Sequence, residues 1–149
     1  GLIIMKPRTR ARSIALQALY EIDMTGHLPE VVLANRLAET PLEDNLFEFA
    51  RSIVFGIQPI VNELDLIIAK HAPEWPLDQV ATIDRNIMRI ALWEIAVSNQ
   101  TPLKVAINEA VELGKLYGSE STPRFVNGVL GSLALHYNDI VQHFKTLTK

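Results

Sequence analysis

The stretch from Thr101 to Tyr137, TPLKVAINEAVELGKLYGSESTPRFVNGVLGSLALHY, contains two helical patterns separated by one short turn. Each pattern begins with a Thr-Pro pair, which suits a helix start because threonine can cap a helix and proline fits its first turn. Gly118 ends the first pattern. In the second pattern the apolar residues recur at helical spacing: Phe125, Val126, Val129, Leu130 and Leu133. The stretch therefore predicts two consecutive helices.

The dipeptide Asn127-Gly128 lies inside the second pattern. In isolation it would favour a β-hairpin, but its apolar neighbours follow a helical period, so we expect it within the helix. A glycine in a helix costs about 1 kcal/mol relative to alanine. We therefore expect a close approach at Gly128, either by another helix or by the backbone of a ligand.

Helical periodicity extends over nearly all of the remaining chain. Together with the two helices above, it predicts about seven helices joined by short loops and no strand; the other five cover 12–22, 29–39, 44–57, 60–72 and 85–97. Thr40 and Asp84 are predicted N-caps, and two prolines predict a break around Trp75. The fold class is all-α, a compact bundle with residues 1–149 as one domain. Residues 1–5 are predicted to be a disordered or cloning-derived start of this domain.

The composition is that of a folded globular protein with an uneven charge distribution. The 149 residues are 48% hydrophobic and 21% charged, and the net charge is −3. The first 20 residues contain four basic and no acidic side chains, for a charge of +4, whereas the other 129 contain 10 basic and 17 acidic ones, for −7. This asymmetry indicates a local anion-binding segment on an acidic protein. No apolar run approaches the ~18 residues of a membrane span, and we expect a cytoplasmic protein with no membrane partner.

The sequence contains no recognisable catalytic, metal or cofactor motif. There is no cysteine, and the four histidines do not have the HExxH spacing of a zinc protease. Glu109 and Glu112 lie three apart on one helix, which is more typical of a solvated face than of an acid/base pair. We therefore expect a protein that is not an enzyme and has neither a metal nor a cofactor.

The basic residues collect in PRTRAR, residues 7–12. On a helix, Arg8 and Arg12 share a face and Arg10 points elsewhere, whereas in an extended chain all three point the same way. Both geometries can contact phosphates, and arginine's planar guanidinium suits a phosphate better than lysine does. From spacing alone, a solvated N-terminal tail is an equally good interpretation.

Three segments resemble the NusB family of bacterial transcription antitermination factors. They are RTRARSIALQALYEID, IDRNIMRIALWEI and VAINEAVELGKLYGSESTPRFVNGVLGSLA, and the resemblance extends from Lys6 to Leu135. It implies an all-helical fold of two packed sub-bundles. It also implies binding to the single-stranded boxA element of nascent ribosomal RNA, together with NusE, a small-subunit ribosomal protein, in an RNA polymerase antitermination complex.

The same resemblance implies the site residues. The RNA-contacting basic motif maps onto Lys6, Arg8, Arg10 and Arg12, as an arm held by a helix that begins near Ser13, with Tyr20 near the same surface. The segment 120–127 resembles a second RNA and partner region, and Lys104 is expected near RNA. In that segment the expected contacts come from Arg124, Phe125 and Asn127. Phe125 has two interpretations, core packing and stacking on a base.

Two other functions remain open from the sequence. The N-terminal RNA-binding module of rRNA cytosine methyltransferases is similar to NusB, although the 149 residues contain no methyl-donor domain. A helical homodimer that binds protein rather than RNA is the other alternative.

Overall fold

A computed structural model describes residues 5–72 and 79–147. Within these ranges every regular element is helical: eight α-helices, one 3₁₀ turn and one π-helix. The all-α prediction is therefore confirmed for the described residues, whereas the predicted break around Trp75 lies outside them. The chain divides into two compact units, unit 1 (residues 1–59) and unit 2 (residues 60–149).

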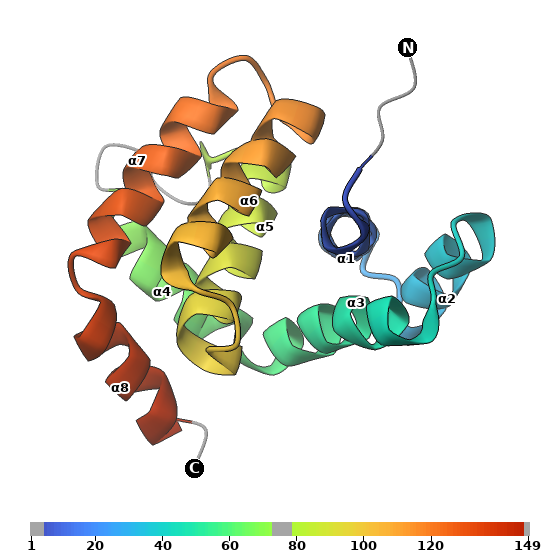
Figure 1. The fold of residues 1–149 in the computed structure, drawn as a ribbon, viewed down its shortest axis with the longest axis horizontal. Helices are drawn as coiled ribbons and strands as arrows, with labels where there is room; N and C mark the ends of the chain where they lie inside the picture. Colours follow the sequence, from blue (N-terminus) through green and yellow to red (C-terminus); the bar gives the residue numbers. More distant parts are fainter. Residues whose placement is uncertain (1–4, 73–78, 148–149) are drawn as a thin grey trace. The chain divides into compact units, whose positions relative to one another are not determined.

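Unit 1 contains α1 (Pro7–Thr25), α2 (Pro29–Glu39) and α3 (Asp44–Ile57). α1 and α2 each begin with a proline, whose fixed φ and missing N–H suit the first helical position. α1 ends at Gly26, which has a φ of +75°, a left-handed conformation that glycine adopts without a Cβ clash. α1 packs against α2 and α3 and crosses α3 (Figure 1).

Small residues allow α1 and α3 to pack closely. Ala11 of α1 and Ala50 of α3 are fully buried in one apolar cluster with Leu46. Leu42 and Phe49 pack against this cluster and are only partly buried. Because Ala11 lies between Arg8 and Arg12 in the sequence, this packing brings the basic turn of α1 to α3.

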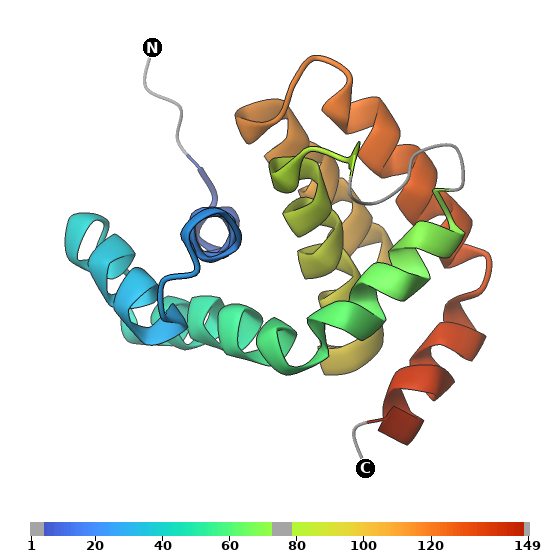
Figure 2. The ribbon, with the colours of Figure 1, turned by 180° about the vertical axis from the view of Figure 1, so that it is seen from behind.

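Unit 2 is the larger group of helices. It contains α4 (Val61–Lys70), α5 (Thr82–Leu92), the π-helix η3 (Trp93–Ser98), α6 (Leu103–Tyr117), α7 (Thr122–Ala134) and α8 (Tyr137–Leu147), and the 3₁₀ turn η1 (Gln58–Ile60) precedes α4. α5 contacts α4, α6 and α7, and α6 and α7 lie side by side as an antiparallel pair (Figures 1 and 2). The predicted pair of helices around Gly118 is thus confirmed.

The last predicted helix corresponds to α7, and a further helix that was not predicted follows it. α7 ends at Ala134, Leu135 is 83% exposed, and α8 begins at Tyr137. α8 packs against η3 and α7 through the buried Ile140, Val141 and Phe144. The patterns described above end at Tyr137, so no helix was predicted over α8.

The predicted N-cap side chains do not cap their helices. α3, α5, α6 and α7 begin without a side-chain cap hydrogen bond. Two of the threonine hydroxyls are used in tertiary contacts instead: Thr101 donates to Glu94 at 2.8 Å, and Thr122 donates to Asp84 at 2.8 Å. These two hydroxyls therefore connect one element to another and do not cap the start of a helix.

The contact of Thr101 explains an acidic residue inside an apolar stripe. Glu94 is 1% exposed and lies in η3, where its backbone carbonyl accepts a hydrogen bond from the Asn99 N–H at 3.1 Å. This five-residue spacing is the π-helical pattern. The buried carboxylate is hydrogen-bonded, as a buried polar group must be to avoid a large desolvation cost.

One helical stretch, Asp44–Lys70, meets a criterion of length and composition for a membrane span, with a mean hydropathy of 1.5. No membrane span was predicted from the sequence. Core helices of soluble proteins meet the same criterion, so it is weak evidence of a membrane span. Ile53, Val54 and Ile57 of this stretch are fully buried.

Candidate nucleic-acid interface

The basic residues near the N-terminus belong to a helix. Lys6 is the N-cap of α1, Pro7 is its first residue, and Arg8 and Arg10 lie exposed in its first turns. The expectation of an arm preceding the first helix is therefore wrong, because Pro7 suits the first helical position and the arginines after it have a high helix propensity. There is no acidic residue in the first turn, so the cations add to the positive end of the helix dipole. The N-terminus of α1 is thus a strongly electropositive helix end.

Arg8 and Arg12 meet the same aromatic ring. The guanidinium carbon of Arg8 lies 3.7 Å from the centroid of the Phe49 ring, and that of Arg12 lies 5.0 Å from it. Both distances fall within the range of cation–π attraction. The helical alternative for the arginines is the one observed, since residues four apart share a face.

Arg12 differs from the other arginines in its exposure. It is 2% exposed, and it takes part in further interactions besides its contact with Phe49. A guanidinium this buried cannot contact a phosphate without moving. The cations that are exposed for phosphate contact in α1 are therefore Lys6, Arg8 and Arg10.

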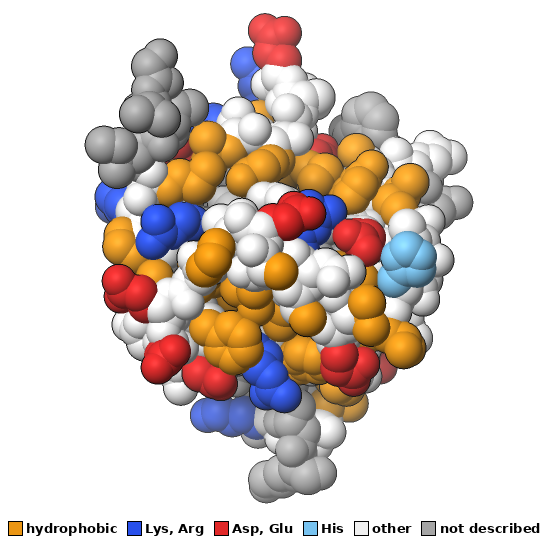
Figure 3. All heavy atoms as spheres, turned by 90° about the vertical axis from the view of Figure 1, so that its right-hand side faces the viewer, with side chains coloured by type: hydrophobic (Ala, Val, Ile, Leu, Met, Phe, Trp, Pro, Cys, Tyr) orange, Lys and Arg blue, Asp and Glu red, His pale blue; other side chains and the backbone are white. Residues whose placement is uncertain are grey.

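Tyr20 lies on the same helix and is 37% exposed. It is ten residues after Arg10, which corresponds to about 15 Å along the axis and to a position about 80° away around the helix. The structure therefore places an exposed aromatic ring farther along α1, to one side of the exposed cation rather than in line with it. The face of unit 1 that carries α2 has mixed charge, unlike the start of α1. Hydrophobic side chains alternate there with both acidic and basic ones (Figure 3).

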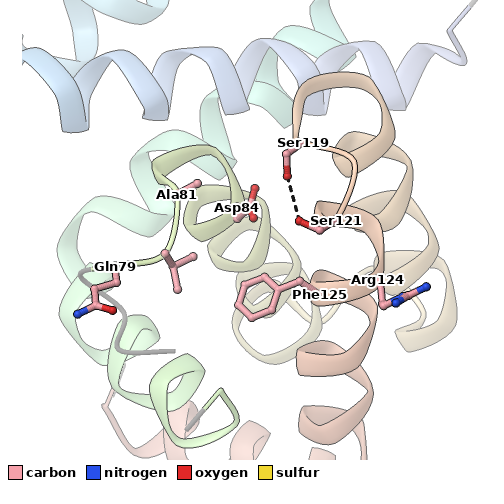
Figure 4. A pocket seen from close by; sticks show the side chains of 8 residues that line it. Gln79, Ala81, Asp84, Ser119, Ser121, Arg124 and Phe125 are labelled. Atoms are coloured by element: carbon pink, nitrogen blue, oxygen red, sulfur yellow. Dashed lines mark hydrogen bonds between the residues drawn. The ribbon is translucent and has the colours of Figure 1, made fainter. Parts of the chain in front are cut away.

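The second predicted region surrounds the start of α7. A pocket of about 410 Å³ lies between the start of α5 and the turn before α7, and Phe125 and Asp84 are among the residues that line it. Figure 4 shows the Phe125 ring pointing into the pocket and the Arg124 side chain pointing away from its centre. Phe125 is half-buried, so it is both packed and accessible from the pocket. The two interpretations of this residue therefore do not exclude each other.

Thr122 fixes the wall of this pocket. It is fully buried, and its hydroxyl accepts from the Ser119 N–H at 2.9 Å while donating to Asp84 Oδ1 at 2.8 Å. Burial raises the pKa of Asp84, and the hydrogen bond from Thr122 opposes that shift. Gly118 allows the turn to approach, since a Cβ there would lie 2.5 Å from the Thr122 side chain.

Asn127 and Lys104 occupy different places in unit 2. Asn127 is exposed on α7, three residues after Arg124 and on a similar side. Lys104 is exposed in the first turn of α6, which runs antiparallel to α7, so it lies about 20 Å along the helix from the start of α7. Arg124 and Asn127 thus share one side of α7, Phe125 points from another side into the pocket, and Lys104 lies at the other end of the helix pair.

The close helix contact expected at Gly128 is not present. Among the described residues, nothing lies within 4 Å of a Cβ built at Gly128, which is exposed. The prediction that another helix packs there is wrong, and the alternative of a ligand backbone stays a prediction.

Sequence reasoning missed Phe49 and the role of Thr122. No spacing in the sequence links Arg8 to Phe49, because the contact depends on how α1 and α3 pack. The Thr-Pro pattern drew attention to Thr122 but assigned it to capping. The roles of Phe49 and Thr122 both depend on tertiary contacts, which local sequence patterns do not indicate.

Known proteins show which family has this fold and these segments. A NusB family model matches residues 9–135. The chain belongs to the NusB family. The transcription antitermination protein NusB of Roseiflexus sp. (strain RS-1) is 48% identical over 134 residues, covering 89% of this chain and 94% of that protein. NusB of Bacillus pumilus (strain SAFR-032) is 39% identical over 138 residues, covering 93% and 99%.

Solved structures of the family have the same fold. T. maritima NusB superimposes with a TM-score of 0.81 at 31% identity, covering 90% of this chain and 94% of that one. A crystal structure of antitermination factors NusB and NusE in complex with dsRNA gives a TM-score of 0.81 at 27% identity, covering 90% and 100%. The NusB-like fold and a non-enzymatic function in transcription antitermination are therefore confirmed. The relatives' names favour this function over a methyltransferase module.

Proposed function

We propose that the protein binds the single-stranded boxA element of nascent ribosomal RNA together with NusE and joins an RNA polymerase antitermination complex in the cytoplasm. In this proposal residues 1–149 act as one RNA-binding domain. The observation that carries it is the electropositive start of α1, with three exposed cations and no acid in its first turn, in a member of the NusB family. The relative solved with NusE and RNA supports the choice of partners.

Each site residue has a role that its surroundings allow. Lys6, Arg8 and Arg10 contact phosphates, which gives affinity without sequence preference. Tyr20 and Phe125 offer ring faces on which unpaired bases can stack, and sequence preference comes from unpaired bases placed against such side chains. Arg12 supports this surface from inside the fold rather than contacting RNA.

The residues at the start of α7 supply the sequence preference. Arg124 adds a phosphate contact, and Asn127 can hydrogen-bond a base edge. Lys104 lies away from this group, so its contribution is a weaker one from a flanking phosphate. A platform with so few contacts benefits from a second RNA-binding protein, which is the role proposed for NusE.

Fluorescence anisotropy tests the proposal with a labelled boxA-like RNA, a scrambled RNA and a boxA duplex. We expect the single-stranded boxA RNA to bind most tightly, and NusE to tighten it further. The Arg8→Ala/Arg10→Ala double variant should weaken all three RNAs, while Phe125→Ala should reduce the preference for boxA over the scrambled RNA. Equal affinity of the wild type and the double variant would contradict the proposed role of α1.

Sedimentation separates this function from a protein-binding homodimer. We expect boxA RNA to change the sedimentation of the protein and to form a complex with it. A dimer whose sedimentation is unaffected by RNA would favour the homodimer instead.

A further inference from the structure

Phe49 contacts the basic turn of α1, although it has no charge and lies on another helix. It projects from α3 beside the cluster of Ala11, Leu46 and Ala50, which fixes its backbone and one side of its ring. The ring is only partly buried, and Arg8 stacks over it at 3.7 Å. Phe49 thus joins the packed interior of unit 1 to an exposed guanidinium.

Stacking leaves the hydrogen-bonding capacity of Arg8 intact. A guanidinium has its five N–H donors in its plane, whereas a ring below it occupies its face. Arg8 can therefore remain on the ring while its N–H groups bind a phosphate. A free arginine side chain carries about 2 kcal/mol of rotamer entropy, and a stacked one has fewer conformations to lose when it binds.

Arg12 contacts the same ring from a buried position. Its guanidinium lies 5.0 Å from the Phe49 centroid and is buried, so the ring is confined from within. The two guanidinium carbons are no farther apart than the sum of their distances to the ring centroid. Like charges this close repel each other, and an anion beside Arg8 relieves that repulsion.

We infer that Phe49 is a positioning residue that holds Arg8 in the orientation in which it contacts an RNA phosphate. This inference rests on the proposed function of α1. Phe49 does not touch the RNA in this role; it acts through Arg8. Its effect on RNA affinity must therefore disappear when Arg8 is absent.

A double-mutant cycle on RNA affinity tests the inference, using full-length wild type, Phe49→Leu, Arg8→Ala and the double variant. We expect Phe49→Leu to weaken boxA-like RNA about two- to five-fold, which is the range for one exposed cation–π contact. In the Arg8→Ala background the same substitution should cause no further weakening. Phe49→Tyr, which keeps the ring, should bind as the wild type does.

Salt dependence adds a second readout. Arg8→Ala removes a charge and should reduce the slope of log K against log salt by about 0.7. Phe49→Leu keeps the charge, so it should lower the affinity with the slope unchanged. Phe55→Leu is the matched control, because it removes the ring under another arginine of α3, Arg51 at 5.0 Å, and should leave RNA binding unchanged.

The outcomes distinguish this inference from the proposed function. If Arg8→Ala leaves RNA affinity unchanged, the proposed role of α1 fails and the inference with it. If Arg8→Ala weakens binding but Phe49→Leu does not, or does so equally without Arg8, Phe49 is only a packing residue. Arg8→Lys, which keeps the charge without touching the apolar cluster, covers the case in which Phe49→Leu unfolds. The Arg8→Lys variant should then bind RNA more weakly than the wild type, with the same slope of log K against log salt. If this variant binds RNA as tightly as the wild type does, the inference is overturned.

Discussion

Arg12→Ala should leave the salt dependence of RNA binding unchanged and lower the stability of the fold. Arg10→Ala should instead reduce the salt dependence and leave the stability unchanged. The two residues lie two apart in one helix and carry the same charge. They differ in burial, since Arg12 is 2% exposed while Arg10 is exposed. The sequence alone does not distinguish the two residues. Comparing the two variants therefore tests the effect of burial, which only the structure shows.

The expected magnitudes follow from the number of exposed cations. Lys6, Arg8 and Arg10 neutralising one phosphate each on single-stranded RNA give a slope of about −2 for log K against log salt, and losing one brings it to about −1.4. Arg12→Ala removes a buried cation–π contact, which is worth about 2 kcal/mol when desolvated, and leaves a space beside Phe49. The free energy of unfolding should fall by at least this amount.

Anisotropy titrations at four or more salt concentrations give the slope, and urea unfolding followed by circular dichroism gives the stability. Arg51→Ala is the matched control for loss of one positive charge, because Arg51 is an exposed arginine of α3 outside the proposed site. It should change neither quantity by much. A reduced slope with unchanged stability in Arg12→Ala would show that Arg12 reaches the RNA, and the reasoning from burial would be refuted.

Three further predictions concern unit 2. Asp65→Ala should destabilise the protein by about 3–5 kcal/mol in urea unfolding, since it leaves the buried Arg89 guanidinium without the carboxylate that accepts its bonds at 2.7 and 2.6 Å; a loss below 1 kcal/mol would contradict this. Gly118→Ala should cost about 1–3 kcal/mol through its clash with Thr122, and an unchanged melting temperature would count against that contact. Asp84 has a pKa raised above its ordinary 3.8, so the folded state binds the extra proton and stability falls as pH rises from about 4 through the raised pKa. Asp84→Asn should lack this fall in unfolding experiments across that range, and an identical pH profile would refute the assignment.

The helices could be predicted from the sequence because helical periodicity is local. Every predicted segment within the described residues is helical, and the pair around Gly118 lies where the pattern put it. The errors concern helix ends, since Thr101 and Thr122 have the right chemistry for capping but better partners elsewhere. The hydroxyls of both threonines lie where they can donate to a carboxylate of another element, Glu94 for Thr101 and Asp84 for Thr122.

The candidate site was only partly predictable. The charge distribution and the resemblance both indicated the cations of α1, and the resemblance alone indicated the aromatic residue of α7. The sequence could not separate Arg12 from Arg10, since burial depends on the packing of α1 against other helices. It gave no indication of Phe49, whose role exists only because Ala11 and Ala50 let two distant segments approach.

The hydrogen bonds of Thr122 have a thermodynamic consequence for any ligand that enters the pocket beside it. The turn from Ser119 to Thr122 is ordered in the free protein by its own hydroxyls and by Asp84. Ordering a free residue costs about 1–2 kcal/mol, and this cost does not recur on binding. Association at the start of α7 should therefore proceed without a slow conformational step. Mutations that remove the hydrogen bonds of this turn should reduce the on-rate even where the residues that contact the ligand are unchanged.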